Sequence, residues 1–345
     1  MKLANQKLLD TLNKDENLYD RSLYSAGPYW SEKAKKINYE LQHKGLDKFR
    51  GYDSGVGTSY CDNIVTNLWN EEVSCLNNIL EFIFCNVPIF KRVGLLFKRT
   101  RSMLIDMHEQ KLRSQEALLK ENNHLKNLLN TFKVEDTINF GCVELVKVGS
   151  KLYSTCYLEL LNTLSFISEK IDFHQIRSMF EIGGGFGANV HLMLQNCNHL
   201  KKIVYLDIVP NLFVGTEYLR AIYGSSVRDY LETKNYDKIK FSNDNDLEIY
   251  CIAPWQMEKL DLVVDYFHNA NSFVEMPENV VKNYSYYIEK IISLHGKVAL
   301  VSYDCFSEDT TFNPKKLLSF CGRDLCMYEY QTLINPERKN YCFIS

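Results

Sequence analysis

The sequence predicts an α/β fold with a parallel sheet in the second half of the chain, preceded by a mostly helical N-terminal region. From about residue 177, short apolar runs end in acidic residues or glycine, and each is followed by a helical pattern. This alternation is typical of a parallel sheet. One of the runs leads directly into a glycine-rich turn. Residues 1 to about 135 instead carry apolar residues at helical spacing.

The predicted sheet contains five strands that follow one another with intervening helices. Helices should begin near Gly187, Asn211 and Glu278, and a helix over Tyr153–Ser168 should join the two halves. Residues 313–345 should add further strands, including an edge strand. The predicted strands are Arg177–Glu181, Lys202–Asp207, Leu247–Ile252, Leu260–Asp265 and Lys297–Tyr303.

The clearest helix of the first half covers about Arg101–Phe132, where leucines recur every three to four residues among polar ones. Its heptad pattern is broken, which favours packing on its own domain over a dimeric coiled coil, although a homo-oligomer stays open. The segment Phe49–Tyr60 is rich in glycine and aromatic residues. It fits a lid or substrate loop and equally a plain connection between helices.

The composition limits the kinds of binding partner and the cellular compartment that we expect. A formal net charge of -3 over 345 residues provides no long-range attraction for nucleic acid or anionic lipid. The 11 cysteines form no CxxC pair and have no regular spacing, which indicates reduced thiols in a cytoplasmic protein. The first residues lack a signal-peptide core, and no apolar run is long enough for a membrane span.

A glycine-rich turn follows the first predicted strand and precedes a helix, in the segment FEIGGGFGANV. It contains Glu181, Gly183, Gly184, Gly185 and Gly187. Glycines permit a sharp turn and a close approach of a ligand to the backbone, and free N–H groups at the helix start favour an anion. In S-adenosylmethionine (SAM) that anion is the methionine carboxylate, and in NAD it is the pyrophosphate.

Asp207 supports a nucleoside ligand of either kind, and Glu181 decides between the two cofactors. Asp207, followed by Ile208, ends the second strand, where either cofactor needs a carboxylate for its ribose hydroxyls. The same turn also satisfies GxGxxA, ending at Ala188. Glu181 suits the ammonium group of SAM but would repel a pyrophosphate. SAM is therefore favoured over NAD, and a glycine turn without a ligand is the weakest interpretation.

Three segments carry a resemblance to a known family: Ile138–Leu194, Asp207–Gly224 and the cluster NSFVEMP at Asn271–Pro277. Together they resemble the bacterial putative sugar O-methyltransferase family over about residues 138–305. The resemblance implies a Rossmann-like class I SAM-dependent methyltransferase domain at residues 136–345, with residues 1–135 as an acceptor-binding region or lid. It departs from the family pattern at Cys142 and at Asp265–Asn269.

The resemblance implies methyl transfer to a sugar hydroxyl of a surface or capsular polysaccharide, or of its nucleotide-linked or lipid-linked precursor. A hydroxyl is a poor nucleophile near neutral pH, so a general base is expected. Ligands in such sheets lie beyond the carboxyl ends of the strands. The candidates there are His268, oriented by Asp265, and Glu275, with Asn269 and Asn271 as hydroxyl ligands.

Other residues complete the predicted site. Trp255 and Gln256 should flank the adenine, Asp265 should help position the methyl donor, and Tyr303 and Asp304 should face the same crevice. No metal is expected, although Asp265, Glu275 and Asp304 could supply oxygen ligands. Nucleic acid is not the expected acceptor, because DYFHN lacks the tetrad that holds a flipped base. A nicotinamide oxidoreductase and a SAM-binding protein without catalysis are the alternatives.

Overall fold

The computed structural model describes residues 5–25, 27–47, 49–51, 119, 121–135, 140–141, 145–303, 313–333 and 339–345. Of the helix expected at Arg101–Phe132, it describes the last part, as α6 (Asn123–Thr131). Most of the segment Phe49–Tyr60 lies outside the described residues, and so do Cys142 and Asp304.

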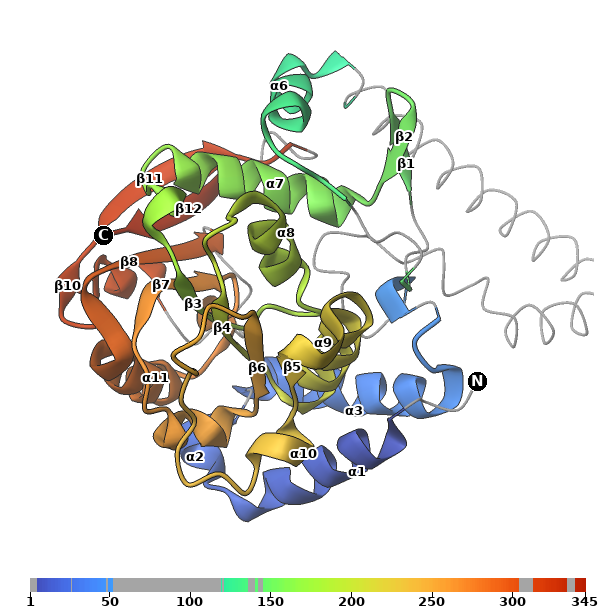
Figure 1. Cartoon of the computed structure of the whole chain (residues 1–345), viewed down its shortest axis with the longest axis vertical. Coiled ribbons are helices and arrows are strands. Elements are labelled where there is room, and N and C mark those ends of the chain that lie inside the picture. Colours follow the sequence, from blue (N-terminus) through green and yellow to red (C-terminus); the bar gives the residue numbers. More distant parts are fainter. Residues whose placement is uncertain are drawn as a thin grey trace, which may run out of the picture.

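An eight-stranded sheet forms the centre of the described chain (Figure 1). Its strand order is β11-β12-β8-β7-β3-β4-β6-β5, in which β12 runs antiparallel to both of its neighbours and the other pairings are parallel. The strands are β3 (Ser178–Ile182), β4 (Lys202–Leu206), β5 (Val227–Arg228), β6 (Glu248–Ile252), β7 (Val264–Ala270), β8 (Ile292–Tyr303), β11 (Cys326–Gln331) and β12 (Lys339–Ile344). The predicted Rossmann-like architecture is confirmed.

Two small hairpins lie outside this sheet: β1 (Val146–Val148) with β2 (Lys151–Tyr153), and β9 (Ser319–Phe320) with β10 (Arg323–Asp324).

Four of the five predicted strands are confirmed, and the fourth was misplaced. Leu260–Asp265 was expected, but β7 is Val264–Ala270, and Leu260 makes only an isolated bridge to Ile239. The sequence pattern does not indicate the second half of β7, because it contains His268 and Asn269, polar residues that are buried in the sheet. Asp265 therefore lies at the amino end of the strand, the end opposite to the one expected.

The helices lie on both faces of the sheet, as alternation along the strands requires. Glu181 of β3 contacts Asn189 of α8 on one face, and Phe267 of β7 stacks on Phe273 and Phe320 on the other. The predicted helix starts are confirmed to within two residues. These helices are α7 (Thr155–Ser168), α8 (Ala188–Asn196), α9 (Val209–Tyr223), α10 (Tyr230–Thr233) and α11 (Glu278–Ile291), with 3₁₀-helices η7 (Pro254–Lys259) and η8 (Phe273–Glu275).

The predicted helical N-terminal region is present as α1 (Gln6–Asp15), α2 (Arg21–Tyr24) and α3 (Gly27–Lys44). These helices pack against α9, α10 and α11 (Figure 1). Their buried leucines belong to the same hydrophobic cluster as the sheet. The domain boundary near residue 135 stays a prediction.

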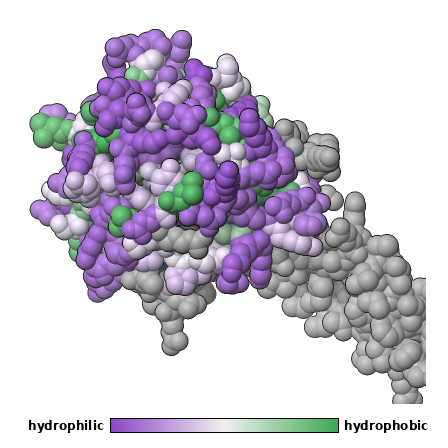
Figure 2. Space-filling model, turned by 90° about the horizontal axis from the view of Figure 1, so that it is seen from below, coloured by the Kyte–Doolittle hydropathy of each residue, from purple (hydrophilic) through white to green (hydrophobic). Residues whose placement is uncertain are grey.

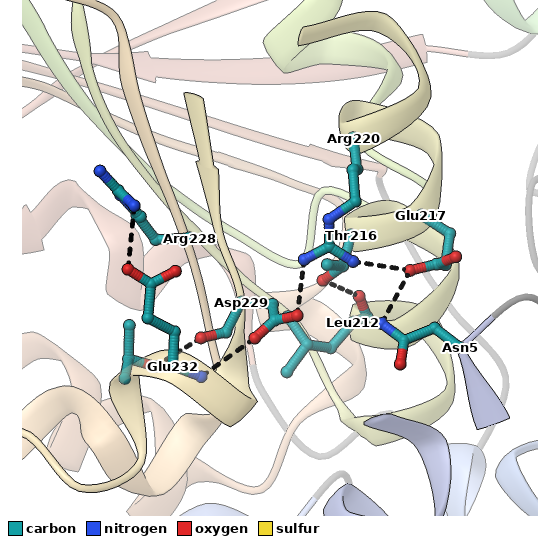
Figure 3. A network of polar contacts seen from close by, with 9 residues as sticks. Asn5, Leu212, Thr216, Glu217, Arg220, Arg228, Asp229 and Glu232 are labelled. Atoms are coloured by element: carbon teal, nitrogen blue, oxygen red, sulfur yellow. Dashed lines mark hydrogen bonds and ion pairs between the residues drawn. The ribbon is translucent and has the colours of Figure 1, made fainter. Parts of the chain in front are cut away.

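Polar contacts hold the start of the chain to α9 and α10. Asn5 donates to Glu217, which also pairs with Arg220 at 2.8 Å, and Arg220 reaches Asp229 at 2.6 Å (Figure 3). At the end of α1, Asp15 pairs with Lys234 at 3.2 Å. The N-terminal segment is thus attached by both apolar packing and ion pairs.

On the face shown in Figure 2, the described surface is mainly hydrophilic, with apolar side chains scattered over it. Among the described helices, none has the length and hydropathy needed to cross a membrane.

Shortening Leu9 to alanine should destabilise the whole chain, because this side chain of α1 is fully buried in the shared core. We expect Leu9→Ala to lower the free energy of unfolding by about 2 to 5 kcal/mol in urea denaturation. The control is Leu18→Ala, whose side chain is 73% exposed. A separate, early transition in Leu9→Ala, with the main transition unchanged, would show that α1 folds independently of the sheet.

Candidate functional site

The glycine turn between β3 and α8 lies at the carboxyl edge of the sheet, beside the end of β4. Gly183 has φ 74° and donates its N–H to Leu206 O at 2.8 Å. A Cβ at this position would lie 2.2 Å from Ser272 Oγ, so only glycine fits. At Gly185, with φ 62°, a Cβ would meet no described atom within 4 Å. The loop therefore presents its backbone at Gly185 to open space, in which a ligand could lie.

Glu181 lies inside this edge and has an unusual environment. It is 2% exposed, and its Oε1 accepts a hydrogen bond from Asn189 Nδ2 at 2.8 Å. Its Oε2 has no hydrogen-bond partner among the described residues. Burial raises the pKa of Glu181 to about 8, the Asn189 bond opposes this, and the charge of Asp207 adds to it. A cation at Oε2 would remove this penalty.

Asp207 follows β4 directly and is held by two backbone donors. Gly185 N–H donates to its Oδ2 at 2.8 Å, and Ile208 N–H donates to its Oδ1 at 2.7 Å. Burial raises the pKa of Asp207 to about 7 although these bonds lower it, and the nearby charge of Glu275 raises it further. The structure thus brings the predicted Glu181, glycine loop, Asp207 and Ile208 together.

Asn211, in the first turn of α9, is a neighbour that the sequence did not single out as a ligand. The Tyr205 hydroxyl donates to the carbonyl groups of both Gly185 and Asn211, which joins the start of α9 to the glycine loop. The Asn211 side chain is buried, and its Oδ1 lacks a hydrogen-bond partner among the described residues. An asparagine near a helix start is so common that its letter alone carries no signal.

Glu275 lies in η8, beyond the end of β7, as the sequence predicted for a residue on the acceptor side. Its Oε2 accepts from Trp30 Nε1 at 2.6 Å, and its Oε1 accepts from the Tyr303 hydroxyl at 2.8 Å. Burial raises its pKa, opposed by these two bonds. Trp30 belongs to α3, so the N-terminal region reaches this site, while Tyr303 extends from β8 as expected.

His268 lies within β7 and is buried. It is paired with Glu181 across β7 and β3, is 2% exposed, and its Nδ1 lies 2.9 Å from the Tyr266 hydroxyl. Burial lowers its pKa to about 4, which keeps the ring neutral near neutral pH. Its position beneath the loop gives it a packing role and argues against the predicted role as base.

Asp265 is not part of this edge, and its predicted roles in orienting His268 and positioning the donor are wrong. It lies near the start of β7, where Oδ2 accepts from the backbone N–H groups of Arg177 at 3.0 Å and Ser178 at 3.1 Å. The carboxylate therefore joins the start of β7 to the start of β3.

Trp255 and Gln256 follow β6 as predicted, but their polar atoms are used within the protein. Trp255 Nε1 donates to the Tyr230 hydroxyl, and its ring stacks on Tyr19 at 5.0 Å. Gln256 accepts from Ala253 N–H and donates to Thr233 Oγ1. Both side chains therefore hold η7 in place, and their expected contact with adenine is not supported by their own contacts.

The two predicted asparagine ligands differ in their positions. Asn269 Nδ2 donates to Ile182 O at 2.8 Å, and its Oδ1 accepts from Phe273 N–H, so it ties the end of β7 to β3. Asn271 adopts φ 62° after β7. In the described part of the chain, no cluster of three or more His, Cys, Asp or Glu side chains could hold a metal ion.

Comparisons with known proteins found similarity to solved structures. No family model and no curated protein matches the chain. The chain is similar to the pyocyanin biosynthetic protein PhzM, with 12% identity over 53% of this chain and 54% of that chain, at a TM-score of 0.36. The match thus spans about half the length of PhzM.

Two further solved structures are similar over a comparable share of the chain. Mitomycin 7-O-methyltransferase MmcR is 13% identical over 54% of this chain and 56% of its own, at a TM-score of 0.32. Magnesium protoporphyrin IX methyltransferase (ChlM) from Synechocystis PCC 6803, with bound SAH, is 8% identical over 55% and 82%, at a TM-score of 0.36. At these values the similarities say nothing about what this chain binds, so its ligand must be judged from its own geometry.

Removing the buried charge of Glu181 should change the pH dependence of stability. Because its pKa is about 8 in the folded chain against 4.5 for the free side chain, wild-type stability is lost as pH rises from about 4.5 to 8. Glu181→Gln lacks this loss. Relative to wild type, we expect it to gain on the order of 2 kcal/mol between pH 5 and 8, measured by urea denaturation without ligand.

The control for this measurement is Glu289→Gln, which removes an exposed glutamate of α11. A constant difference between Glu181→Gln and wild type across this pH range would mean that the buried carboxyl is not destabilised by its environment.

Proposed function

We propose that this chain is a SAM-dependent methyltransferase whose glycine loop, Glu181 and Asp207 bind the cofactor. The observation that carries the proposal is the buried Glu181 Oε2, which lacks a partner among the described residues beside a loop open at Gly185. The ammonium of the methionine moiety fits this oxygen, and the free N–H groups where α8 begins fit its carboxylate. Asp207 suits the ribose hydroxyls.

The same residues disfavour NAD. A pyrophosphate at the glycine loop would bring negative charge towards two buried carboxylates, Glu181 and Asp207, whose pKa values burial has already raised. Binding would then require both to remain protonated. A cationic cofactor has the opposite effect, because it stabilises their charged forms.

SAM supplies an activated methyl group on a sulfonium, so the protein has mainly to align the acceptor, exclude water and remove a proton. Glu275 is the carboxylate best placed for this last task. Its raised pKa makes it a stronger base than an ordinary glutamate. A bound cofactor would supply the methyl group to the acceptor oxygen, and Glu275 would take up the acceptor proton.

The acceptor that we propose is a sugar hydroxyl of a surface or capsular polysaccharide or of its nucleotide-linked or lipid-linked precursor, modified in the cytoplasm. The support is the resemblance carried by Asn271–Pro277, the cluster that contains Glu275. The contact between Trp30 and Glu275 brings an indole ring of the N-terminal region to the same place. An indole face suits the apolar face of a pyranose ring.

Cofactor binding is tested by thermal unfolding with S-adenosylhomocysteine (SAH) and, in parallel, with NADH. At a hundredfold excess over Kd, a ligand stabilises the folded state by about 2.7 kcal/mol, which should raise Tm by about 3 °C or more. We expect this increase with SAH and none with NADH. An increase with NADH alone would replace the proposal with a nicotinamide oxidoreductase.

Catalysis is tested with Glu275→Gln in an assay that transfers labelled methyl from SAM to a panel of sugar nucleotides. Loss of the base should lower kcat by about a hundredfold or more, while SAH affinity stays within about twofold of wild type. The control is Glu278→Gln, because Glu278 pairs at the surface with Lys282 and Lys316. Methyl transfer by wild type that Glu275→Gln leaves intact would remove Glu275 from the mechanism. Cofactor binding without transfer to any acceptor would favour a SAM-binding protein without catalysis.

A further inference from the structure

Asn211 has the features of a ligand-binding residue. Its side chain is 4% exposed, and Oδ1 has no hydrogen-bond partner among the described residues. A buried acceptor that has lost water and gained no donor destabilises the folded chain by about 1 to 3 kcal/mol. Such groups are rare in folded proteins, and one that lies beside a ligand site can be satisfied by a donor from the ligand.

The position of Asn211 identifies the part of the site that it serves. The Tyr205 hydroxyl bridges the carbonyls of Gly185 and Asn211, so Asn211 lies next to the point where the glycine loop is open. The Asn211 amide is also close enough to Asp207 to lower the pKa of that carboxyl, against the larger effect of burial. Two acceptors, the Asp207 carboxylate and Asn211 Oδ1, therefore lie side by side.

Asp207 alone has little capacity left. Each of its oxygens already accepts one backbone N–H, from Gly185 and from Ile208. The Asn211 side chain gives Asp207 a third hydrogen bond. A carboxylate offers about four acceptor positions, so about one remains. A ribose carries two hydroxyl donors on adjacent carbons. Two neighbouring acceptors, Asp207 and Asn211, match this pair of donors better than they would match a single amino group.

We propose that Asn211 Oδ1 accepts a hydrogen bond from one ribose hydroxyl of the cofactor while Asp207 accepts one from the other. This inference rests on the function proposed above. Asn211 then takes part in recognising the ribose of the cofactor, in addition to Asp207 at the end of β4.

The test is calorimetric titration of wild type and Asn211→Leu with SAH, 2′-deoxy-SAH and 3′-deoxy-SAH. Asn211→Leu should weaken SAH binding by between about threefold and about tenfold, as expected for one hydrogen bond between neutral groups. One of the two deoxy analogues should bind wild type with a similar loss and should lose nothing further in Asn211→Leu. This thermodynamic cycle separates the hydroxyl contact from any indirect effect of the substitution on Asp207.

The matched control is Asn340→Leu, which removes another buried asparagine whose Oδ1 lacks a partner among the described residues. It lies on β12, on the far side of β8 and β7 from the glycine loop, and should bind SAH like wild type. Asn211→Ala provides a second variant for the same cycle if the leucine does not fit.

The outcomes separate the two proposals. Equal SAH affinity in wild type and both Asn211 variants overturns this inference and leaves the proposed function standing. The inference is likewise overturned if the variants lose as much affinity for both deoxy analogues as for SAH. Failure of wild type to bind SAH overturns the proposed function and this inference with it.

Discussion

The arrangement of the site depends on the burial of two carboxylates, Glu181 and Asp207, at the carboxyl edge of the parallel sheet. Parallel pairing of β3 with β4 brings their ends together and leaves the glycine loop between them. Burying like charges in this way is unfavourable unless a counter-charge or hydrogen-bond donors are supplied. The protein supplies donors from Asn189, Gly185 and Ile208 and leaves Glu181 Oε2 without one among the described residues. Under the proposed function, the ligand supplies the remaining compensation.

The N-terminal segment completes the surroundings of this edge. Trp30 of α3 donates to Glu275, and Tyr19 stacks on Trp255 after β6. Helix α1 shares the hydrophobic cluster of the sheet. The segment therefore couples the acceptor side of the site to the packing of the whole chain, and a change in its docking would alter the environment of Glu275 directly.

The fold and the grouping of Glu181, the glycine loop and Asp207 could be predicted from the sequence because both depend on local patterns. Short apolar runs, the glycine turn and the acidic residues at the strand ends are each contained within a few residues of one another. The prediction of the fourth strand was wrong because His268 and Asn269 are polar residues in a buried strand. Their hydrogen-bond partners, the Tyr266 hydroxyl and the Ile182 carbonyl, are not evident from the sequence. As a result, Asp265 was predicted at the carboxyl end of this strand, whereas it lies near the amino end.

The contacts that sequence could not predict are long-range ones. The partner of Glu275 is 245 residues away at Trp30, and Trp255 packs on Tyr230 and Tyr19. The letters APWQ indicated a residue beside adenine, yet both polar side chains are used to hold η7. The sequence did not identify Asn211 as a candidate ligand residue. Only the structure shows that its side-chain oxygen is buried without a hydrogen-bond partner among the described residues.

The most direct test of the buried carboxylate pair is the number of protons released when SAH binds. With pKa values of about 8 for Glu181 and about 7 for Asp207, both carboxyls are partly protonated at pH 7 in the free chain. Calorimetric titration in buffers of different ionisation enthalpy should show net release of more than about half a proton per SAH bound. Binding that is independent of the buffer, or that takes up protons, would contradict the view that these carboxyls acquire their charge together with the ligand.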